Sequence, residues 1–460
     1  MGNRQKAKGN LQWAIGRGKE VICDINKISN RMNFPIIERE SLEAIKILQE
    51  QLLQETLSYV SQNSAYYKAL FEKENINIEN LKTIEDLQQI PVTTKDDLQR
   101  NNDDFLCVPR HKIIDYCTTS GTLGDPVTFG LTDKDLDRLA YNEAVSFDVA
   151  GIKEGDVVQL MTTIDRRFVA GLAYFLGLRK LGAGVIRVGA GIPQLQWDSI
   201  LKYKPNYLIT VPSFLLKLIE FAENHGIDYN NCGIKGAICI GEPLRNQDFS
   251  MNILSKKITE KWNIKLFSTY ASTEMSTAFT ECEHFKGGHH HPELIITEVL
   301  NDDNLPVKTG ESGELTITTL GVEGMPLLRF KTGDIVQLHD EPCECGRNTL
   351  RVGPVLGRKQ QMIKYKGTTL YPPAMHDVLN HFDSVENHLI EISTNELGTD
   401  EIVIKIASND ASDELLHEIK DYFRAKLRVT PKIEFATSDE LQQIVFPAMS
   451  RKPIRFFDLR

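Results

Sequence analysis

The stretch VVQLMTTIDRRFVAGLAYFLGLRKLGAGVIRV, residues 157–188, decides the fold class. Short apolar runs at its two ends, 157–161 and 185–188, are typical of buried strands, and the intervening segment 168–181 has the apolar spacing of a helix. Further short runs follow at 207–211, 237–240 and 264–267, with a second helical segment at 214–224. Because strands alternate with helices, we expect an α/β layer with a largely parallel sheet.

The segments around this layer divide the chain into three expected parts. Residues 1–37 are basic and polar and indicate an N-terminal arm. Residues 38–356 form the expected large domain, which includes a β-rich stretch at 310–340. Residues 357–460 form an expected small α+β domain, with strands at 388–393, 401–407 and 432–436 and a helix near 413–427.

Composition excludes several classes of protein. Lys and Arg total 53 against 63 Asp and Glu, a net charge of −10, which argues against a general nucleic-acid binder. We see neither an apolar run of about 18 residues, as a membrane span needs, nor a signal-peptide core. We therefore expect a cytoplasmic protein without a membrane partner. Eight Cys are too few for a disulfide scaffold, so we expect thiols or metal ligands.

The segment TTSGTLGDP, residues 118–126, has the composition of a phosphate-binding loop. Glycines, hydroxyls and backbone N–H groups can donate several hydrogen bonds to a polyphosphate without adding bulk. The segment is not a Walker A motif, because it lacks the Gly-Lys-Ser/Thr ending. The alternative interpretation is a polar surface turn.

The segment YASTE, residues 270–274, directly follows the apolar run that ends at Phe267. Ligands commonly bind beyond the carboxyl ends of strands in α/β sheets. Glu274 could hold Mg²⁺ and Tyr270 could stack on a base, whereas the alternative is an ordinary strand-to-helix turn. Asp334 could accept hydrogen bonds from a ribose. Lys452, taken alone, would be a solvated side chain near the C-terminus.

Taken in order, these segments resemble the adenylate-forming superfamily and, within it, the phenylacetate–CoA ligase family. The resemblance extends over most of the chain after about residue 38. Further segments that carry it are SAYY at 64–67, LQQIPVTTKDDL at 87–98, GEP at 241–243, 357–372 and DLR at 458–460.

This resemblance implies a two-step reaction. ATP and a carboxylic acid form an acyl-adenylate, and CoA then attacks it after a small C-terminal lid domain rotates. Phosphate binding is implied for Thr119, Ser120, Gly121, Thr122 and Gly124. The rest of the nucleotide site is implied to comprise Gly241, Glu242, Pro243, Tyr270, Ala271, Ser272, Thr273, Asp334 and Arg358. Glu274, through Mg²⁺, and Lys452 are the implied catalytic residues.

Some positions depart from the family pattern. Asp125 stands before the Pro, where the family usually has Lys or another residue, and a carboxylate beside a triphosphate is repulsive unless a cation intervenes. Leu123 replaces a second Thr and removes one hydroxyl. A degenerate member that binds nucleotide without efficient catalysis is therefore an alternative. So is transfer to a carrier-protein thiol or another acceptor.

Three cysteines and a histidine run predict a zinc site. CEC at 343–345 and Cys282 supply three thiols, and GGHHH at 287–291 follows the latter. Three thiolates and one imidazole suit tetrahedral Zn²⁺, with His289 as the fourth ligand and His291 as the alternative. Four protein ligands leave no open position, so we expect a structural ion. The competing interpretation is unligated thiols and a solvated histidine run.

The acid is not readable from the sequence. An aryl acid such as phenylacetate is favoured by the resemblance, and a short aliphatic acid is the alternative. Candidate lining residues lie between about 140 and 275. Phe168 and Tyr141 could stack on an aromatic acid or could equally belong to the core. A homodimer is suggested only by the resemblance.

Overall fold

The computed structural model describes residues 36–119, 127–365, 368–395, 400–446 and 453–460. The chain forms two compact units. The first comprises the chain up to Glu242 together with 262–332 and 337–353, and the second comprises 243–261, 333–336 and 354–460. The expected arm lies almost wholly outside the described residues, and the expected three-part division stays a prediction.

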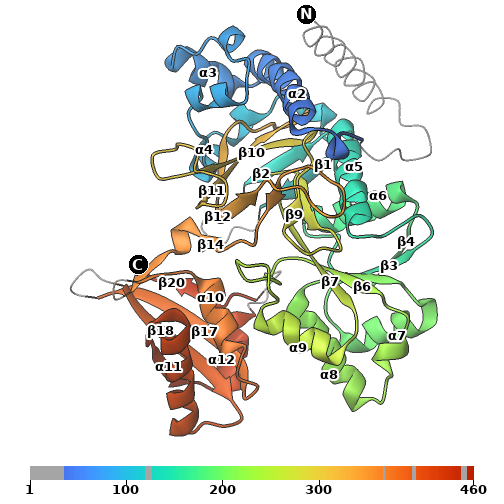
Figure 1. Cartoon of the computed structure of the whole chain (residues 1–460), viewed down its shortest axis with the longest axis vertical. Coiled ribbons are helices and arrows are strands. Elements are labelled where there is room, and N and C mark those ends of the chain that lie inside the picture. The colour runs from blue at the N-terminus through green and yellow to red at the C-terminus, as the bar shows by residue number, and fades with distance from the viewer. Residues whose placement is uncertain (1–35, 120–126, 366–367, 396–399, 447–452) are drawn as a thin grey trace, which may run out of the picture. The chain divides into compact units, whose positions relative to one another are not determined.

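A parallel sheet forms the α/β layer of the first unit (Figure 1). Its strands pair in the order β4-β3-β5-β6-β7, all parallel. They are β3 (Val157–Leu160), β4 (Gly184–Arg187), β5 (Tyr207–Thr210), β6 (Gly236–Cys239) and β7 (Lys265–Ser272). The predicted α/β fold is confirmed, because each short apolar run became one of these strands.

Helices pack on this sheet through an apolar cluster that includes Leu160, Leu178 and Ile238, all fully buried. The helices that contribute to this cluster are α5 (Asp133–Val149) and α6 (Val169–Leu181). Helices α7 (Pro193–Tyr203) and α8 (Pro212–Asn224) follow β4 and β5 in the chain. Helix α6 ends at Gly182, whose φ of 83° is easily adopted only by glycine. Helices α5 and α6 approach closely at Gly177, where a Cβ would lie 2.3 Å from Glu143 Cβ.

An antiparallel region continues the sheet beyond β7, which confirms the β-rich stretch expected at 310–340. Its strands are β8 (Thr277–Glu281), β9 (Gly288–His289), β10 (Ile295–Leu300), β11 (Ser312–Thr319), β12 (Phe330–His339) and β13 (Arg351–Val352). The N-terminal part contributes the 3-10 turn Ile36–Arg39, α2 (Leu42–Asn63), α3 (Ala65–Lys73), α4 (Lys95–Arg100) and the hairpin of β1 (Asp115–Thr118) with β2 (Thr128–Leu131).

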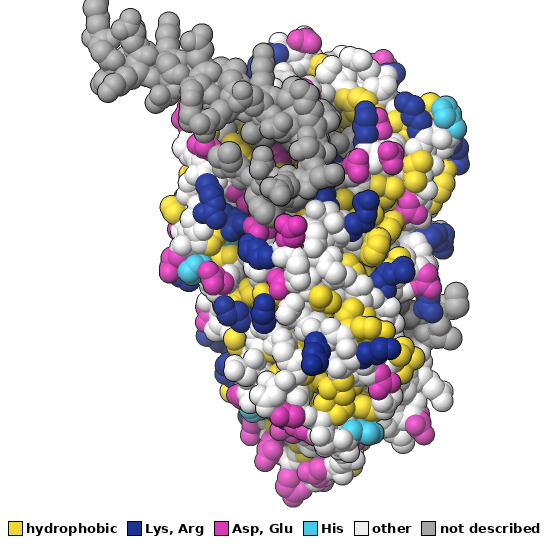
Figure 2. Space-filling view, turned by 90° about the vertical axis from the view of Figure 1, so that its right-hand side faces the viewer, with side chains coloured by type: hydrophobic (Ala, Val, Ile, Leu, Met, Phe, Trp, Pro, Cys, Tyr) yellow, Lys and Arg dark blue, Asp and Glu magenta, His cyan; other side chains and the backbone are white. Residues whose placement is uncertain are grey.

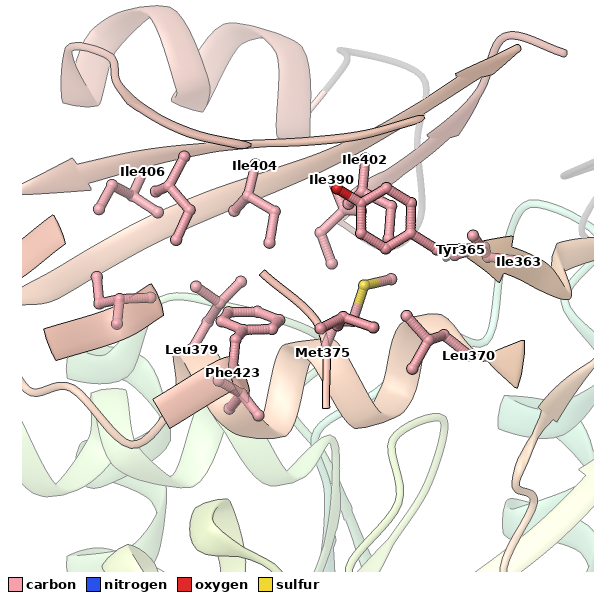
Figure 3. Close-up of a cluster of buried hydrophobic side chains, with 14 of the residues drawn as sticks. Ile363, Tyr365, Leu370, Met375, Leu379, Ile390, Ile402, Ile404, Ile406 and Phe423 are labelled. Atoms are coloured by element: carbon pink, nitrogen blue, oxygen red, sulfur yellow. The ribbon is translucent and has the colours of Figure 1, made fainter. Parts of the chain in front are cut away.

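The second unit has its own core between a sheet and two helices (Figure 3). Ile390, Ile402 and Ile404 from the sheet lie over Met375 and Phe423 from the helices. The sheet pairs β19-β18-β17-β20, and strand β14 pairs with residues 334–335 of β12. Its elements are α9 (Ile253–Lys261), β14 (Gly357–Arg358), β15 (Ile363–Tyr365), β16 (Thr368–Leu370), α10 (Pro372–Leu379), β17 (Val385–Thr394), β18 (Asp400–Ser408), α11 (Asp413–Leu427), β19 (Lys432–Phe435), α12 (Ser438–Val445) and β20 (Phe456–Asp458).

The surface carries charges of both signs. On the face drawn in Figure 2, Lys and Arg side chains alternate with Asp and Glu, and apolar side chains lie between them. Among the described residues, every helix is too short or too polar to cross a bilayer.

Candidate nucleotide site and cysteine–histidine cluster

The predicted phosphate loop begins and ends on the β1–β2 hairpin. Thr119 is buried, its N–H donates to Val127 O at 3.0 Å, and its hydroxyl accepts from Val127 N at 3.0 Å. These paired bonds close the base of the loop. Ser120, Gly121, Thr122 and Gly124, together with Asp125, lie outside the described residues, so their predicted role stays a prediction.

The predicted adenine-side turn, 241–243, follows β6. Gly241 has a φ of 77°, which favours glycine at this position. The Glu242 carboxylate accepts from Ser213 N at 2.9 Å and from Ser213 Oγ at 2.8 Å. Glu242 therefore caps the N-terminus of α8, where a negative charge is favourable. Sequence reasoning missed this bond, although Pro212 in the first turn of the helix marks where α8 begins.

The segment 270–274 closes a hairpin of β7 and β8, so the expected alternative of a strand-to-helix turn is wrong. Tyr270 stacks on Phe279 of β8, with ring centroids 6.0 Å apart. Ser272 Oγ accepts from Met275 N at 3.3 Å and shapes the turn that presents Glu274. Thr273 and Ala271 lie in the same hairpin end.

Glu274 lies in the turn between β7 and β8. Its charge acts on Cys117 of β1, where burial above all, then Asp115 and, to a smaller extent, Glu274 raise the pKa of the thiol to about 12. The charge of the predicted magnesium ligand therefore affects β1, the strand that leads into the predicted phosphate loop. The sequence alone did not predict this interaction between Glu274 and β1.

Asp334 and Arg358 form an ion pair within the second unit. They lie opposite each other in the β12–β14 pairing, with Arg358 Nε 3.3 Å from Asp334 Oδ1. Asp334 is buried and Arg358 is half-exposed. The sequence placed both at the nucleotide but did not predict that they would bind each other. Lys452, the predicted catalytic cation, lies outside the described residues.

Four predicted zinc ligands converge in one cluster. Cys282, His289, Cys343 and Cys345 place their ligand atoms within 4.8 Å of one another. The Cys282 and Cys343 sulfurs are 3.6 Å apart, and Cys345 Sγ lies 3.4 Å from His289 Nε2. Tetrahedral zinc with Zn–S of about 2.3 Å and Zn–N of about 2.0 Å requires separations of about 3.8 and 3.5 Å. These two separations agree with a tetrahedral ion, and all four ligand atoms lie within 4.8 Å of one another.

The ring of His289 is oriented as in a metal site, and the thiols of the cluster interact strongly with one another. Hydrogen bonding between Cys282 and Cys345 raises the pKa of Cys282 and, together with a smaller contribution from His289, lowers the pKa of Cys345. His289 Nδ1 lies 3.0 Å from Thr349 Oγ1, which orients the ring with Nε2 toward the sulfurs. Such a partner on the second ring nitrogen is usual for metal-binding histidines.

The other two histidines of the run lie elsewhere. His291 Nδ1 binds Glu38 at 2.7 Å and Nε2 lies 3.0 Å from Ser146 Oγ. His290 Nε2 lies 2.7 Å from Ile295 O, and burial lowers its pKa to about 4. The alternative of a solvated run is wrong, because all three side chains are buried. The geometry favours His289 over His291 as the fourth ligand.

Known proteins are similar to this chain in sequence and in fold. A family model described as AMP-binding enzyme matches residues 40–324. The phenylacetate-coenzyme A ligase of Thermus thermophilus is 30% identical over 391 residues, covering 84% of this chain and 85% of the relative. The Escherichia coli phenylacetate-coenzyme A ligase is 27% identical over 438 residues, covering 92% and 97%. Protein CapK of Staphylococcus aureus is 23% identical over 398 residues, covering 85% and 83%.

Among solved structures, 2-hydroxyisobutyryl-CoA ligase in the postadenylation state superimposes with a TM-score of 0.80. It is 24% identical, and the match covers 93% of this chain and 92% of that chain. This likeness shows the fold. The family match, which takes in the hairpin base at Thr119, the turn at 241–243 and Glu274, confirms the predicted resemblance. The chain therefore belongs to the family of AMP-binding enzymes.

Proposed function

We propose that this chain joins a carboxylic acid to AMP and then transfers the acyl group to the thiol of CoA. The observation that carries this proposal is the match to phenylacetate-coenzyme A ligases over nearly the whole chain. An aryl acid such as phenylacetate is the favoured substrate on the same ground.

The chemistry explains which residues the reaction needs. A carboxylate is a poor electrophile, and its approach to ATP brings two anions together. Neutralising that charge is the main catalytic requirement. In this proposal Glu274 holds Mg²⁺, which supplies Lewis-acid charge neutralisation when bound. Lys452 reaches the acid carboxylate and the α-phosphate.

The remaining predicted residues bind and orient the nucleotide. Thr119 and the loop that follows it cradle the β- and γ-phosphates. Tyr270 and the turn at 241–243 frame the adenine, with the Glu242 carboxylate engaged by Ser213 rather than by the base. Asp334 accepts from the ribose hydroxyls, and Arg358 shares that carboxylate.

Tyr141 and Phe168, the two aromatic residues predicted to contact the acid, differ in their surroundings. Tyr141 lies in α5 and donates its hydroxyl to buried Glu293 at 2.9 Å, so this hydrogen bond holds its side chain. Phe168 is half-buried at the start of α6, next to the exposed Asp165–Arg167 turn. Phe168 is therefore the better candidate for an aryl ring.

The cysteine–histidine cluster is the proposed zinc site. Cys282, His289, Cys343 and Cys345 supply all four ligands, so the ion is structural and joins β8, β9 and the turn after β12. A cytoplasmic location and a homodimer, without nucleic-acid or membrane partners, complete the proposal. Cell fractionation and analytical ultracentrifugation test those two properties.

Pyrophosphate release tests the main proposal. The purified chain is given ATP and Mg²⁺ with a panel of aryl and aliphatic acids, each with and without CoA. We expect release that depends on one acid class and turns over repeatedly only with CoA. Turnover with a carrier-protein thiol in place of CoA would identify the acceptor differently. ATP binding without release for any acid would favour the degenerate alternative.

A further inference from the structure

A short N-terminal segment, Glu38–Glu40, lies directly on the cysteine turn of the cluster. Arg39 Nη1 donates to Cys345 O at 3.1 Å. Asn348 donates its N–H to Glu38 O at 2.8 Å and its side-chain amide to Arg39 O at 3.1 Å and Glu40 O at 3.0 Å. Residues 38–40 are therefore hydrogen-bonded to residues 345–348, more than 300 positions later, at the turn that carries the predicted ligands Cys343 and Cys345.

The turn is shaped to accept this segment. Gly346 has a φ of 83°, and a Cβ there would lie 2.5 Å from Arg39 Nη1. A larger residue at this position would both strain the backbone and push Arg39 from Cys345 O. The glycine after Cys345 thus serves the contact with residues 38–40 as well as the turn itself.

Arg347 connects the segment to a metal-ligand sulfur. Its Nε donates to Glu38 Oε2 at 2.7 Å, and its Nη2 lies 3.5 Å from Asp148 Oδ2. Its Nη1 donates to Cys345 Sγ at 3.7 Å. Two carboxylates therefore fix a buried guanidinium so that one of its N–H groups points at the thiolate. Arginine suits this task because its donors form a rigid planar fork.

The second oxygen of Glu38 is also occupied. It lies 2.7 Å from His291 Nδ1, and His291 Nε2 lies 3.0 Å from Ser146 Oγ. Serine, histidine and a carboxylate in this order have the geometry of a nucleophilic triad. The three residues are between 0% and 2% exposed, so a substrate could not reach them. We interpret the array as the hydrogen-bonded support of a buried carboxylate.

From these contacts we propose that Glu38 and Arg347 are positioning residues for the metal site, and that metal binding and docking of residues 38–40 stabilise each other. The inference rests on the proposed zinc site. Arg347 stabilises the charge of a ligand thiolate, and Glu38 holds Arg347 in place. Because the coupling is a free energy between two sites, each event must favour the other by the same factor.

Zinc release from the full-length chain tests the first half. Wild type, Glu38→Gln and Glu298→Gln are loaded with zinc, their metal content is measured, and transfer to a colorimetric chelator is timed. Glu298 is a matched control, because it is also a carboxylate paired with an arginine. It accepts hydrogen bonds from Arg329 Nε at 3.1 Å and from Arg329 Nη2 at 3.0 Å, and it lies in β10, which carries none of the four ligands. Loss of an outer-sphere partner typically weakens metal binding about 10- to 100-fold. We expect release about ten-fold faster or more from Glu38→Gln only.

Equal release rates in Glu38→Gln and Glu298→Gln would overturn the inference while leaving the zinc site standing. Absence of zinc from the wild type would instead remove the zinc site itself, so the two failures are distinguishable. Arg347→Lys is the second variant if Glu38→Gln does not fold. It keeps the charge but loses the fork, and we expect the same faster release from it.

Limited trypsin digestion tests the second half. Arg39 is a cleavage site whose side chain and carbonyl both bind the cysteine turn. We expect chelation of zinc from the full-length chain to accelerate cleavage after Arg39 but not after Arg110, whose guanidinium pairs with Asp103 on the surface. Equal acceleration at both sites, or none after Arg39, would refute the coupling.

Discussion

The buried carboxyl of Glu143 predicts how stability depends on pH. Glu143 lies within α5, fully buried against α6, and receives one hydrogen bond, from Asn142 at 3.1 Å. Burial raises the pKa of this carboxyl to about 8 from the usual 4.5, and the bond from Asn142 opposes the rise only in part. The folded chain therefore binds a proton at Glu143 that the unfolded chain has already lost near neutral pH.

The sign and size of the effect follow from this difference. A raised pKa in the folded state stabilises fully below about pH 4.5, and the stabilisation is lost as pH rises toward 8. The slope is about 1.4 kcal/mol per pH unit, so the loss reaches roughly 5 kcal/mol above pH 8. Glu143→Gln keeps the shape and the polar contact and removes the titration. We expect the variant to be more stable than wild type by several kcal/mol at about pH 9 and similar to it at about pH 5.

Urea unfolding followed by tryptophan fluorescence measures this difference. Trp197 and Trp262 both lie in the first unit, stacked with centroids 5.6 Å apart, so they report on the unit that holds Glu143. Exposed Glu283→Gln is the control for loss of one carboxylate in the same unit. Parallel stability–pH curves for wild type and Glu143→Gln would refute the reasoning, because they would mean that Glu143 reaches water when it ionises.

Three further predictions concern the site. Lys452→Ala should reduce adenylation about 100-fold or more and leave ATP binding largely intact, whereas surface Lys432→Ala should leave adenylation unchanged. Pyrophosphate release measures adenylation and equilibrium binding measures ATP affinity. Unchanged adenylation in Lys452→Ala would remove Lys452 from the mechanism. Metal analysis of protein purified without chelator should find about one zinc per chain, and Cys343→Ser should lose it; freely reactive thiols in metal-free wild type would contradict the site. Ser213→Ala should cost about 1 kcal/mol of stability, because α8 loses the part of its cap that Glu242 provides through the Ser213 hydroxyl. It should also raise the KM for ATP more than it lowers kcat, because Glu242 in the nucleotide turn loses that partner. Denaturation measures the first effect and steady-state kinetics the second, and an unchanged KM would exclude a link between Ser213 and nucleotide binding.

Local patterns were sufficient to predict the strands of the parallel sheet and several of the helices. The run at 157–161 became β3, the spacing at 168–181 became α6, and the helix expected near 413–427 is α11 with those bounds. Each prediction worked because a short buried strand or an amphipathic helix is specified by residues close together in sequence.

Features that depend on distant partners were not predictable. Glu242 was expected at the adenine, but its carboxylate binds Ser213, which is 29 residues away. His289 and His291 could not be separated by spacing, because the direction of each ring depends on where β9 ends. The partner of His291 is Glu38, 253 residues earlier, and that distance hides the interaction from any local pattern.

The discontinuity of the second unit has a consequence for synthesis on the ribosome. The first unit possesses all its residues once Gly353 has been made, whereas the second contains 243–261 and 333–336 and also needs everything from 354 to 460. Since domains generally fold as units while the chain is made, helix α9 emerges long before the strands with which it shares a unit. The hydrogen bond of 3.0 Å from Ile253 N to the Asp377 carboxylate can form only after more than a hundred further residues have been made. A chaperone that binds the nascent chain would find α9 still without that partner.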